Sequence, residues 1–228
     1  MNSNPPTCLA YIPAKATSVR LPRKNILPLG DKPVLAWSIE AARDSGIMDR
    51  IIVSTESEEI AEVARAYGAE VPFLRPPNLS LPQVPNHEVL LHLLAELKTR
   101  DGYVPDMVMT LQPTSPLRSS EDIRAAHALA LTHFPKPVIS LNKEIFIPTH
   151  VCEVDDQGNI VQAQIASPHR ALHKMNGAIF IASTEKILTA INPYENAISF
   201  LMPAHRSLDV DTADDLEMTR AIAKHFNL

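Results

Sequence analysis

The apolar positions of this chain follow two alternating patterns. Short, nearly continuous apolar runs predict buried strands, and they occur at 9–13, 50–54, 71–74, 106–111 and 137–141. Between these runs, apolar residues recur at helical spacing, most clearly over 33–45, between Thr55 and Gly68, and over 87–97. Strands that alternate with amphipathic helices predict βαβ units, and therefore a three-layer α/β fold whose mostly parallel sheet has helices on both faces.

Capping signals mark where three of the predicted helices begin. Each signal is a Ser or Thr followed three residues later by an acidic side chain, so that the pair can satisfy free backbone N–H groups. The three pairs are Thr55 with Glu58, Ser119 with Asp122, and Thr212 with Asp215. We therefore expect a helix to start directly after the first residue of each pair.

The regular alternation breaks after about residue 143. Two short apolar stretches, 151–154 and 160–163, flank the turn-rich run 155–159 and predict an antiparallel hairpin. The rest of the chain predicts strands at 177–182, 197–202 and 207–210, and helices at 183–191 and after 212. Because no repeat or linker interrupts the chain, we expect 1–228 to form a single domain, in which the small antiparallel excursion 143–175 is a lid or a dimer contact.

Charge and composition narrow the range of partners. The chain has 228 residues and a net charge of −5, so it lacks the basic surface typical of a nucleic-acid-binding domain. No apolar run approaches the roughly 18 residues that cross a bilayer, and the first residues do not resemble a signal peptide. We expect no membrane contact and a cytoplasmic location. Cys8 and Cys152 stand far apart, so neither a disulfide framework nor a metal-binding pair is indicated.

An acidic protein that binds an anion must concentrate its positive charge locally, and one loop does so. The segment 13–25 follows the first predicted strand and holds four cations and a serine, namely Lys15, Arg20, Arg23, Lys24 and Ser18. Ligands in open α/β sheets bind beyond the carboxyl ends of the strands, so this loop suits a triphosphate. It lacks the spacing of a P-loop or of a dinucleotide-binding glycine motif. A solvated basic loop without a ligand is the alternative.

Two further segments carry polar side chains at predicted strand ends. Asp209 and Asp211 lie two residues apart, so on a strand both carboxylates would point to one side and could hold Mg²⁺ together with phosphate oxygens and water. The segment 111–118 offers hydrogen-bond donors on a backbone that is stiffened by two prolines. Each segment also has a purely structural interpretation, a helix cap for the first and a turn before a helix for the second.

Five motifs, taken in order, resemble one family. They are Pro-Ala with the basic loop and Pro-x-Lys-Asn, then Val-Ser-Thr, Leu-Gln-Pro-Thr-Ser-Pro-Leu-Arg, Asn-Gly-Ala-Ile-Phe-Ile and Leu-Asp-Val-Asp-Thr. From about residue 10 to its C-terminal helix, the chain resembles the acylneuraminate cytidylyltransferases (CMP-sialic acid synthetases) and bacterial relatives that activate legionaminic and pseudaminic acids. The resemblance implies a Rossmann-like nucleotide-diphospho-sugar transferase fold. It also implies an enzyme that transfers CMP from CTP to the anomeric hydroxyl of a sialic-acid-like ulosonic acid and releases pyrophosphate.

The resemblance further implies substrates, a cofactor and site residues. CTP and an acidic sugar are the implied substrates, Mg²⁺ the cofactor, and a homodimer the assembly. The resemblance assigns nucleotide binding to Lys15, Ser18, Arg20, Arg23, Lys24, Asn25 and Arg75. It assigns sugar binding to Gln112, Thr114, Ser115, Lys174, Asn176 and Gly177. The implied catalytic residues are Lys24, Asp209 and Asp211, with both aspartates binding the metal. The base that deprotonates the sugar hydroxyl stays open between an aspartate and a metal-bound hydroxide.

The chain departs from the family pattern in two places. The usual Ala-Arg-Gly-Gly-Ser-Lys reads Ala-Lys-Ala-Thr-Ser-Val at 14–19, which removes a bidentate arginine, two glycines and a lysine. We therefore expect weaker CTP binding or a different path of the loop. The segment 79–87 lacks the usual Asp-Thr/Ser-Ser run, and Lys174 replaces an arginine, so the identity of the acceptor stays open. Two alternatives stand beside the leading one: a transferase for 3-deoxy-octulosonate or another sugar, and a homologue that binds a nucleotide without turnover.

Overall fold

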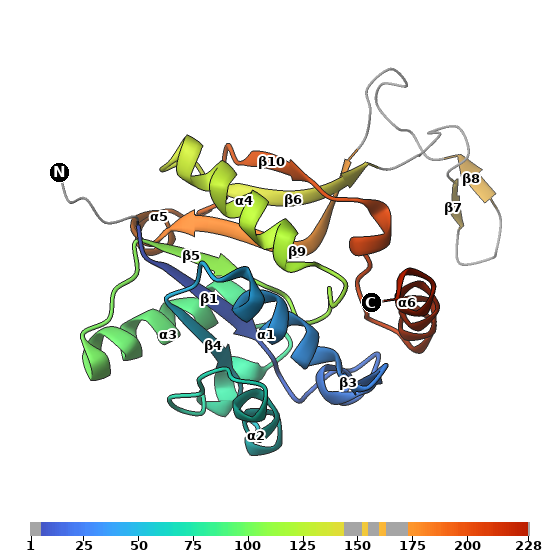
Figure 1. Ribbon diagram of the computed structural model, residues 1–228, viewed down its shortest axis with the longest axis horizontal. Coiled ribbons are helices and arrows are strands. Elements are labelled where there is room, and N and C mark those ends of the chain that lie inside the picture. Colours follow the sequence, from blue (N-terminus) through green and yellow to red (C-terminus); the bar gives the residue numbers. More distant parts are fainter. Residues whose placement is uncertain (1–5, 144–151, 155–159, 163–172, 228) are drawn as a thin grey trace.

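The computed structural model describes residues 6–143, 152–154, 160–162 and 173–227. Its main sheet has six strands in the order β10-β6-β9-β5-β1-β4 (Figure 1). The strands are β1 (Cys8–Pro13), β4 (Arg50–Ser54), β5 (Met107–Thr110), β6 (Val138–Lys143), β9 (His173–Ser183) and β10 (Ile198–Leu201). Neighbouring strands are parallel, except that β9 is antiparallel to both β5 and β6. The predicted α/β fold with a mostly parallel sheet is confirmed.

Helices cover both faces of this sheet. On one face α1 (Val34–Ser45) and α4 (Ser120–His133) pack against each other, with α2 (Glu58–Ala66) beside α1. On the other face lie α3 (Asn86–Asp101) and α5 (Thr184–Thr189), which share a core with the central strands (Figure 1). The sheet is therefore the middle layer of three, as expected for βαβ units.

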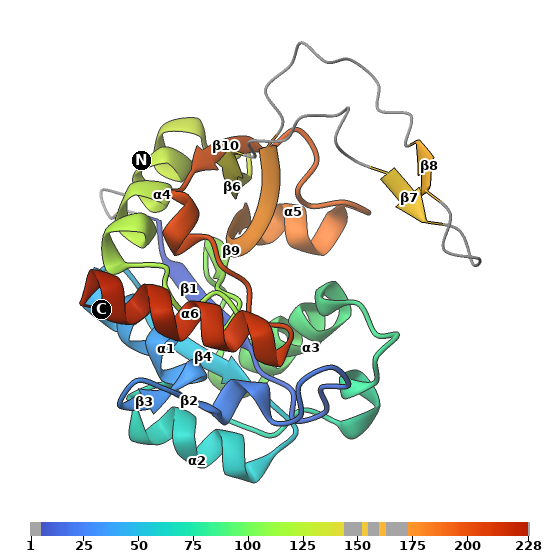
Figure 2. The ribbon, with the colours of Figure 1, turned by 90° about the vertical axis from the view of Figure 1, so that its right-hand side faces the viewer.

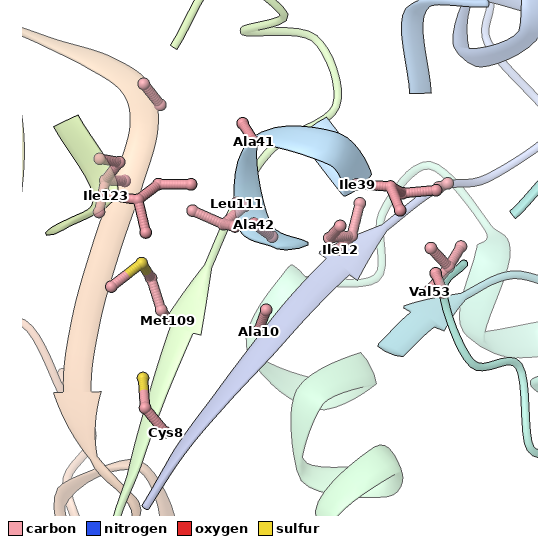
Figure 3. Close-up of a cluster of buried hydrophobic side chains, with 14 of the residues drawn as sticks. Cys8, Ala10, Ile12, Ile39, Ala41, Ala42, Val53, Met109, Leu111 and Ile123 are labelled. Atoms are coloured by element: carbon pink, nitrogen blue, oxygen red, sulfur yellow. The ribbon is translucent and has the colours of Figure 1, made fainter. Parts of the chain in front are cut away.

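Alternate residues of β1 enter two different cores. Leu9 and Tyr11 pack with α3 and α5, whereas Cys8, Ala10 and Ile12 pack with α1 and its neighbours (Figure 3). All of these side chains are fully buried, because successive residues of a strand point to opposite faces and both faces are covered here. The continuous apolar run in the sequence thus reflects burial on both sides.

A small third core anchors the C-terminal helix α6 (Ala213–Phe226). Leu216 of α6 and Val210, just before it, pack with Leu29 and Val34. Leu29 belongs to a two-stranded turn formed by β2 (Pro28–Leu29) and β3 (Lys32–Pro33), which precedes α1 (Figure 2). Arg220 of α6 also donates to the carbonyl oxygen of Pro28 at 2.6 Å. This packing fixes the position of the segment 209–211, which contains Asp209 and Asp211 and precedes α6.

Two predicted strands do not form. Of the region around 71–74, only Glu70 bridges to Ile52, because Pro72 has no N–H with which to continue the ladder. Residues 207–210 are irregular and follow the short 3₁₀ helix η4 (Ala204–Arg206).

One predicted helix cap is displaced, and the other two are confirmed. The side chain of Ser57, not that of Thr55, caps α2 by accepting from Ile60 N at 3.4 Å. Thr55 instead accepts from Ser57 N at 3.1 Å, because the chain needs two more residues to turn from β4 into the helix. Complete capping boxes start the other two helices, Ser119 with Asp122 in α4 and Thr212 with Asp215 in α6.

The predicted hairpin is present within the excursion. β7 (Cys152–Val154) pairs antiparallel with β8 (Ile160–Gln162). The turn 155–159 and most of the rest of 143–175 lie outside the described residues, so a lid or dimer contact there stays a prediction. In the described part of the chain, no helix is long and apolar enough to cross a membrane.

The capping box of α4 gives a direct test of local stability. Ser119→Ala is expected to lower the free energy of unfolding by about 1 kcal/mol, because Ser119 Oγ accepts from Asp122 N at 3.2 Å and the Asp122 carboxylate accepts from Ser119 N at 3.0 Å. Urea denaturation followed by circular dichroism measures the change. Ser120→Ala, one residue into the helix, is the matched control and should cost less than about 0.5 kcal/mol. Equal losses in the two variants would contradict the assignment.

Candidate active site

A cavity of about 260 Å³ opens at the carboxyl ends of β1 and β5. The chain passes from β1 to β4 on one side of β1 and later returns to β5 on the other side. Ligands in open α/β sheets bind where the strand order reverses in this way. Eight residues singled out in the sequence line the cavity: Lys15, Lys24, Asn25, Arg75, Gln112, Thr114, Asp209 and Asp211.

The backbone of the basic loop is held against neighbouring segments. Ala14 N donates to Ser54 O at the end of β4 at 3.0 Å. The buried amide of Asn25 donates from Nδ2 to Lys15 O at 2.9 Å. These bonds keep Lys15 and Lys24 in the cavity wall, and they show that the Nδ2 end of the Asn25 amide is committed to the shape of the loop, whereas its buried Oδ1 has no partner among the described residues.

The structure does not bring every predicted nucleotide-binding residue into this lining. Arg20 is largely exposed and reaches the site by pairing with Asp211. Arg23 has φ +59° and pairs with Glu59 of α2. Neither Arg23 nor Ser18 lines the cavity, so among the remaining charges of the basic loop that of Arg20 alone joins the two lining lysines.

Asp211 lies between two cations. Its Oδ1 accepts from Lys24 Nζ at 2.8 Å, and its Oδ2 pairs with Arg20. The side chain of Lys24 is 15% exposed and that of Arg20 is 67% exposed, so solvent screens the Lys24 pair far less. The positive loop and the acidic segment therefore meet at one side of the cavity.

Asp209 faces the cavity from the same segment as Asp211. Val210, between them, donates from N to Thr114 O at 2.7 Å. Although the residue is open to the cavity, partial burial of its carboxyl group, together with the nearby charge of Asp211, raises the pKa of Asp209. A poorly solvated carboxylate next to a second one is stabilised by a cation bound between them.

The two carboxylates fit a magnesium ion that takes its remaining ligands from a nucleotide. Within the described ranges, no group of three or more His, Cys, Asp or Glu could hold a metal ion alone. Mg²⁺ is commonly bound by one or two carboxylates together with phosphate oxygens and water. Because Asp209 and Asp211 both line the cavity, the donor set suits a hard cation that arrives with a phosphate ligand.

A second cavity of about 480 Å³ adjoins the first. Gln112 and Asp209 line both cavities. Strand β9 contributes Lys174, Asn176 and Gly177 to the second wall. Lys174 is exposed there, which gives this cavity a cation that can bind an anionic group.

Two predicted sugar-binding residues are engaged within the protein. The buried Asn176 side chain accepts from Ser140 Oγ at 2.6 Å and from Ala178 N at 3.1 Å, and it donates to Ser207 Oγ at 2.9 Å. Ser115 is fully buried and donates from Oγ to Asn176 O at 3.3 Å. Both residues therefore hold the wall of the second cavity in shape.

Two buried charged residues support the site from outside the first cavity. Arg118, which is 2% exposed, donates from Nη1 to Ala178 O at 2.7 Å, and burial lowers its pKa to about 9. Glu56 accepts from Ala16 N at 2.8 Å and from Arg75 Nη2 at 2.9 Å. No motif in the sequence predicted a role for Glu56. Its place just after the carboxyl end of β4 was a usable signal, because ligand sites gather at that edge of the sheet.

Comparison with known protein families defines the class. The model of the family described as cytidylyltransferase matches residues 9–198. The chain therefore belongs to the cytidylyltransferase family and is a nucleotidyltransferase.

Individual relatives agree with this class. The chain is 35% identical over 223 residues to CMP-N,N'-diacetyllegionaminic acid synthase of Legionella pneumophila, covering 94% of this chain and 95% of that protein. It is 29% identical over 234 residues to pseudaminic acid cytidylyltransferase of Campylobacter jejuni, with 95% and 96% covered. The solved structure of CMP:2-keto-3-deoxy-manno-octonic acid synthetase complexed with CTP has a TM-score of 0.72 at 16% identity, covering 96% of this chain and 99% of that one. The family resemblance and the nucleotidyltransferase fold expected from the motifs are confirmed.

A substitution at Gly177 tests how closely this residue approaches Gln112, which lines both cavities. It has φ +76°, and an added Cβ would lie 3.4 Å from Gln112 Oε1. Gly102→Ala is the matched control, because Gly102 has φ +65° but open space around it. In urea denaturation the free energy of unfolding of both Gly→Ala variants should fall by about 1–2 kcal/mol, because alanine is strained in the left-handed backbone conformation. Only Gly177→Ala should also raise the KM of the acceptor substrate, and equal KM values in the two variants would contradict the close approach.

Proposed function

We propose that this protein transfers CMP from CTP to the anomeric hydroxyl of a sialic-acid-like ulosonic acid and releases pyrophosphate. The observation that carries the proposal is the pair of adjoining cavities that share Gln112 and Asp209. The first combines Lys15 and Lys24 with two aspartates, as a metal-bound triphosphate requires. The second presents Lys174, which suits the carboxylate of an acidic sugar.

The named relatives support this acceptor class over the alternatives. Their names specify diacetyllegionaminic acid and pseudaminic acid. The octulosonate alternative rests on a structure of 16% identity, which is a likeness of fold alone. A homologue without turnover is disfavoured because the expected set Lys24, Asn25, Gln112, Asp209 and Asp211 is intact and lines one cavity.

In this proposal the triphosphate lies along the basic loop. Lys15 and Lys24 face the cavity and Arg20 reaches its edge, so three cations neutralise phosphate charge. Arg75 is buried in the same wall and faces the base and ribose. The loop acts through these side chains, since the N–H of Ala16 is already bound to Glu56.

The chemical step joins the contents of the two cavities. The sugar hydroxyl loses its proton and attacks the α-phosphorus of CTP, and the new oxygen–phosphorus bond forms as the bond to the β-phosphate oxygen breaks and pyrophosphate leaves. Lys24 stabilises the negative charge that builds on the phosphate oxygens. Asp209 and Asp211 would hold Mg²⁺, which when bound neutralises phosphate charge. Lys174 orients the acceptor by pairing with its carboxylate.

Lys24 can exchange partners during nucleotide binding. Its Nζ is 2.8 Å from Asp211 Oδ1, so a phosphate that binds Lys24 competes with this carboxylate, which Arg20 also binds, and can release it from Lys24. The released carboxylate can then bind the cation that accompanies the phosphates. Nucleotide and metal binding are therefore coupled through one ion pair.

Assembly and location are proposed from the family resemblance alone. We propose a homodimer, with the excursion 143–175 as the contact, and a cytoplasmic location. Neither proposal rests on a contact among the described residues.

Pyrophosphate release tests the function directly. With CTP and Mg²⁺, the protein is incubated with N-acetylneuraminic, legionaminic, pseudaminic and 3-deoxy-octulosonic acids, and turnover is expected with one of the first three. Turnover only with 3-deoxy-octulosonic acid would replace the proposed acceptor. Silence with every sugar, in folded protein, would contradict the proposal, and calorimetry with CTP would then show whether a nucleotide still binds.

Asp211→Ala tests the proposed catalytic carboxylate. It is expected to lower kcat by about a thousandfold, because it removes both a metal ligand and the partner of Lys24. The melting temperature should change little, since Asp211 is partly exposed and its segment is anchored by Val210. Asp214→Ala, exposed in the first turn of α6, is the matched control. Near-normal turnover in Asp211→Ala would remove this residue from the metal role.

A further inference from the structure

Glu56 connects three segments from behind the wall of the first cavity. It lies between β4 and α2, and its side chain is 12% exposed. Oε1 accepts from Ala16 N in the basic loop at 2.8 Å. Oε2 accepts from Arg75 Nη2 at 2.9 Å and from Ser80 Oγ at 2.7 Å. One carboxylate thus links three segments, namely the basic loop, the connection from β4 to α2 that contains Glu56, and the segment 75–80.

Arg75 depends on this carboxylate as its counter-ion. The Arg75 side chain is 3% exposed, and a buried guanidinium without an acidic partner is costly. Its Nε donates to Ser80 Oγ at 2.8 Å and its Nη2 donates to Glu56. These bonds fix two sides of the guanidinium and leave Nη1, which has no hydrogen-bond partner among the described residues, for the cavity that Arg75 lines.

The basic loop depends on the same carboxylate for its path. Ala16 and Thr17 lack the conformational freedom of glycine, and each is held in place by a hydrogen bond. Ala16 N donates to Glu56, and Thr17 Oγ1 donates to Ser80 O at 3.3 Å. The loop is therefore fixed directly after Lys15, by one bond to Glu56 and one to the segment that carries Arg75.

We infer that Glu56 is a positioning residue for the nucleotide, which sets the distance between Lys15 on the phosphate side and Arg75 on the base side of the cavity. Glu56 does not line the cavity, so it acts through these two residues. The inference rests on the proposed function, because it assumes that the ligand is a nucleoside triphosphate.

The charge state of Glu56 agrees with this role. Burial alone would raise the pKa of Glu56, but hydrogen bonds from Ser80 and from the Ala16 backbone hold it below its usual value. The carboxylate is therefore ionised at neutral pH and able to accept all three bonds.

Glu56→Gln tests the inference with little change in shape. The amide keeps one acceptor but replaces the other with a donor, which cannot accept from Ala16 N or from Arg75. The Kd for CTP, measured by calorimetry with Mg²⁺ and without sugar, should rise about tenfold. The sugar KM, and kcat at saturating CTP, should stay within about twofold. A purely structural residue would lower the melting temperature and leave the Kd of the folded protein unchanged.

Two further variants complete the experiment. Glu58→Gln is the matched control, because Glu58 pairs with Arg65 on the exposed side of α2, and its Kd for CTP should equal that of the wild type. Ser80→Ala removes the hydroxyl between Glu56 and Arg75, from a residue that also lines the first cavity, and should raise the Kd about threefold. It carries the test if Glu56→Gln does not fold.

The outcomes separate the inference from the proposed function. A wild-type Kd in Glu56→Gln, or in Ser80→Ala where only that variant folds, overturns the positioning role and leaves the function standing. Wild-type protein that binds no CTP overturns both.

Discussion

The hydrogen bond from Val210 N to Thr114 O joins two segments that lie far apart in the chain, and the candidate site depends on it. Val210 is fully buried in the small core that anchors α6, so the bond fixes a point on an otherwise irregular segment. The residues on either side, Asp209 and Asp211, then face the first cavity. The pairing of Lys24 and the wall shared by the two cavities both follow from this one attachment.

The sequence predicted the sheet and its covering helices because both leave a local pattern. The central strand β1 is buried on both faces and reads as a continuous apolar run. Two strand predictions failed. Pro72 ended the ladder that the apolar residues around it predicted. The segment 207–210 has the apolar pattern of a strand, but Val210 N donates to Thr114 O in a turn and not to a strand.

The site was predicted less completely, because its contacts join distant segments. The two aspartates line the cavity as expected, but the reason given for it, alternation along a strand, is wrong. Asn176 was expected at the sugar, yet its amide is committed to Ser140, Ala178 and Ser207. Glu56 was missed because its partners, Ala16 and Arg75, lie in two other segments, and no residue spacing in the sequence indicates hydrogen bonds between such distant segments.

Because Lys24 is already paired with Asp211, an anion that binds Lys24 in the first cavity competes with a carboxylate. A divalent cation that accompanies the anion compensates the displaced carboxylate, whereas a bare anion leaves Asp211 paired with Arg20 alone beside new negative charge. The ion pair is thus an intramolecular competitor for any anion that binds Lys24. The same pair can form again as that anion leaves, so it opposes tight retention of the anion.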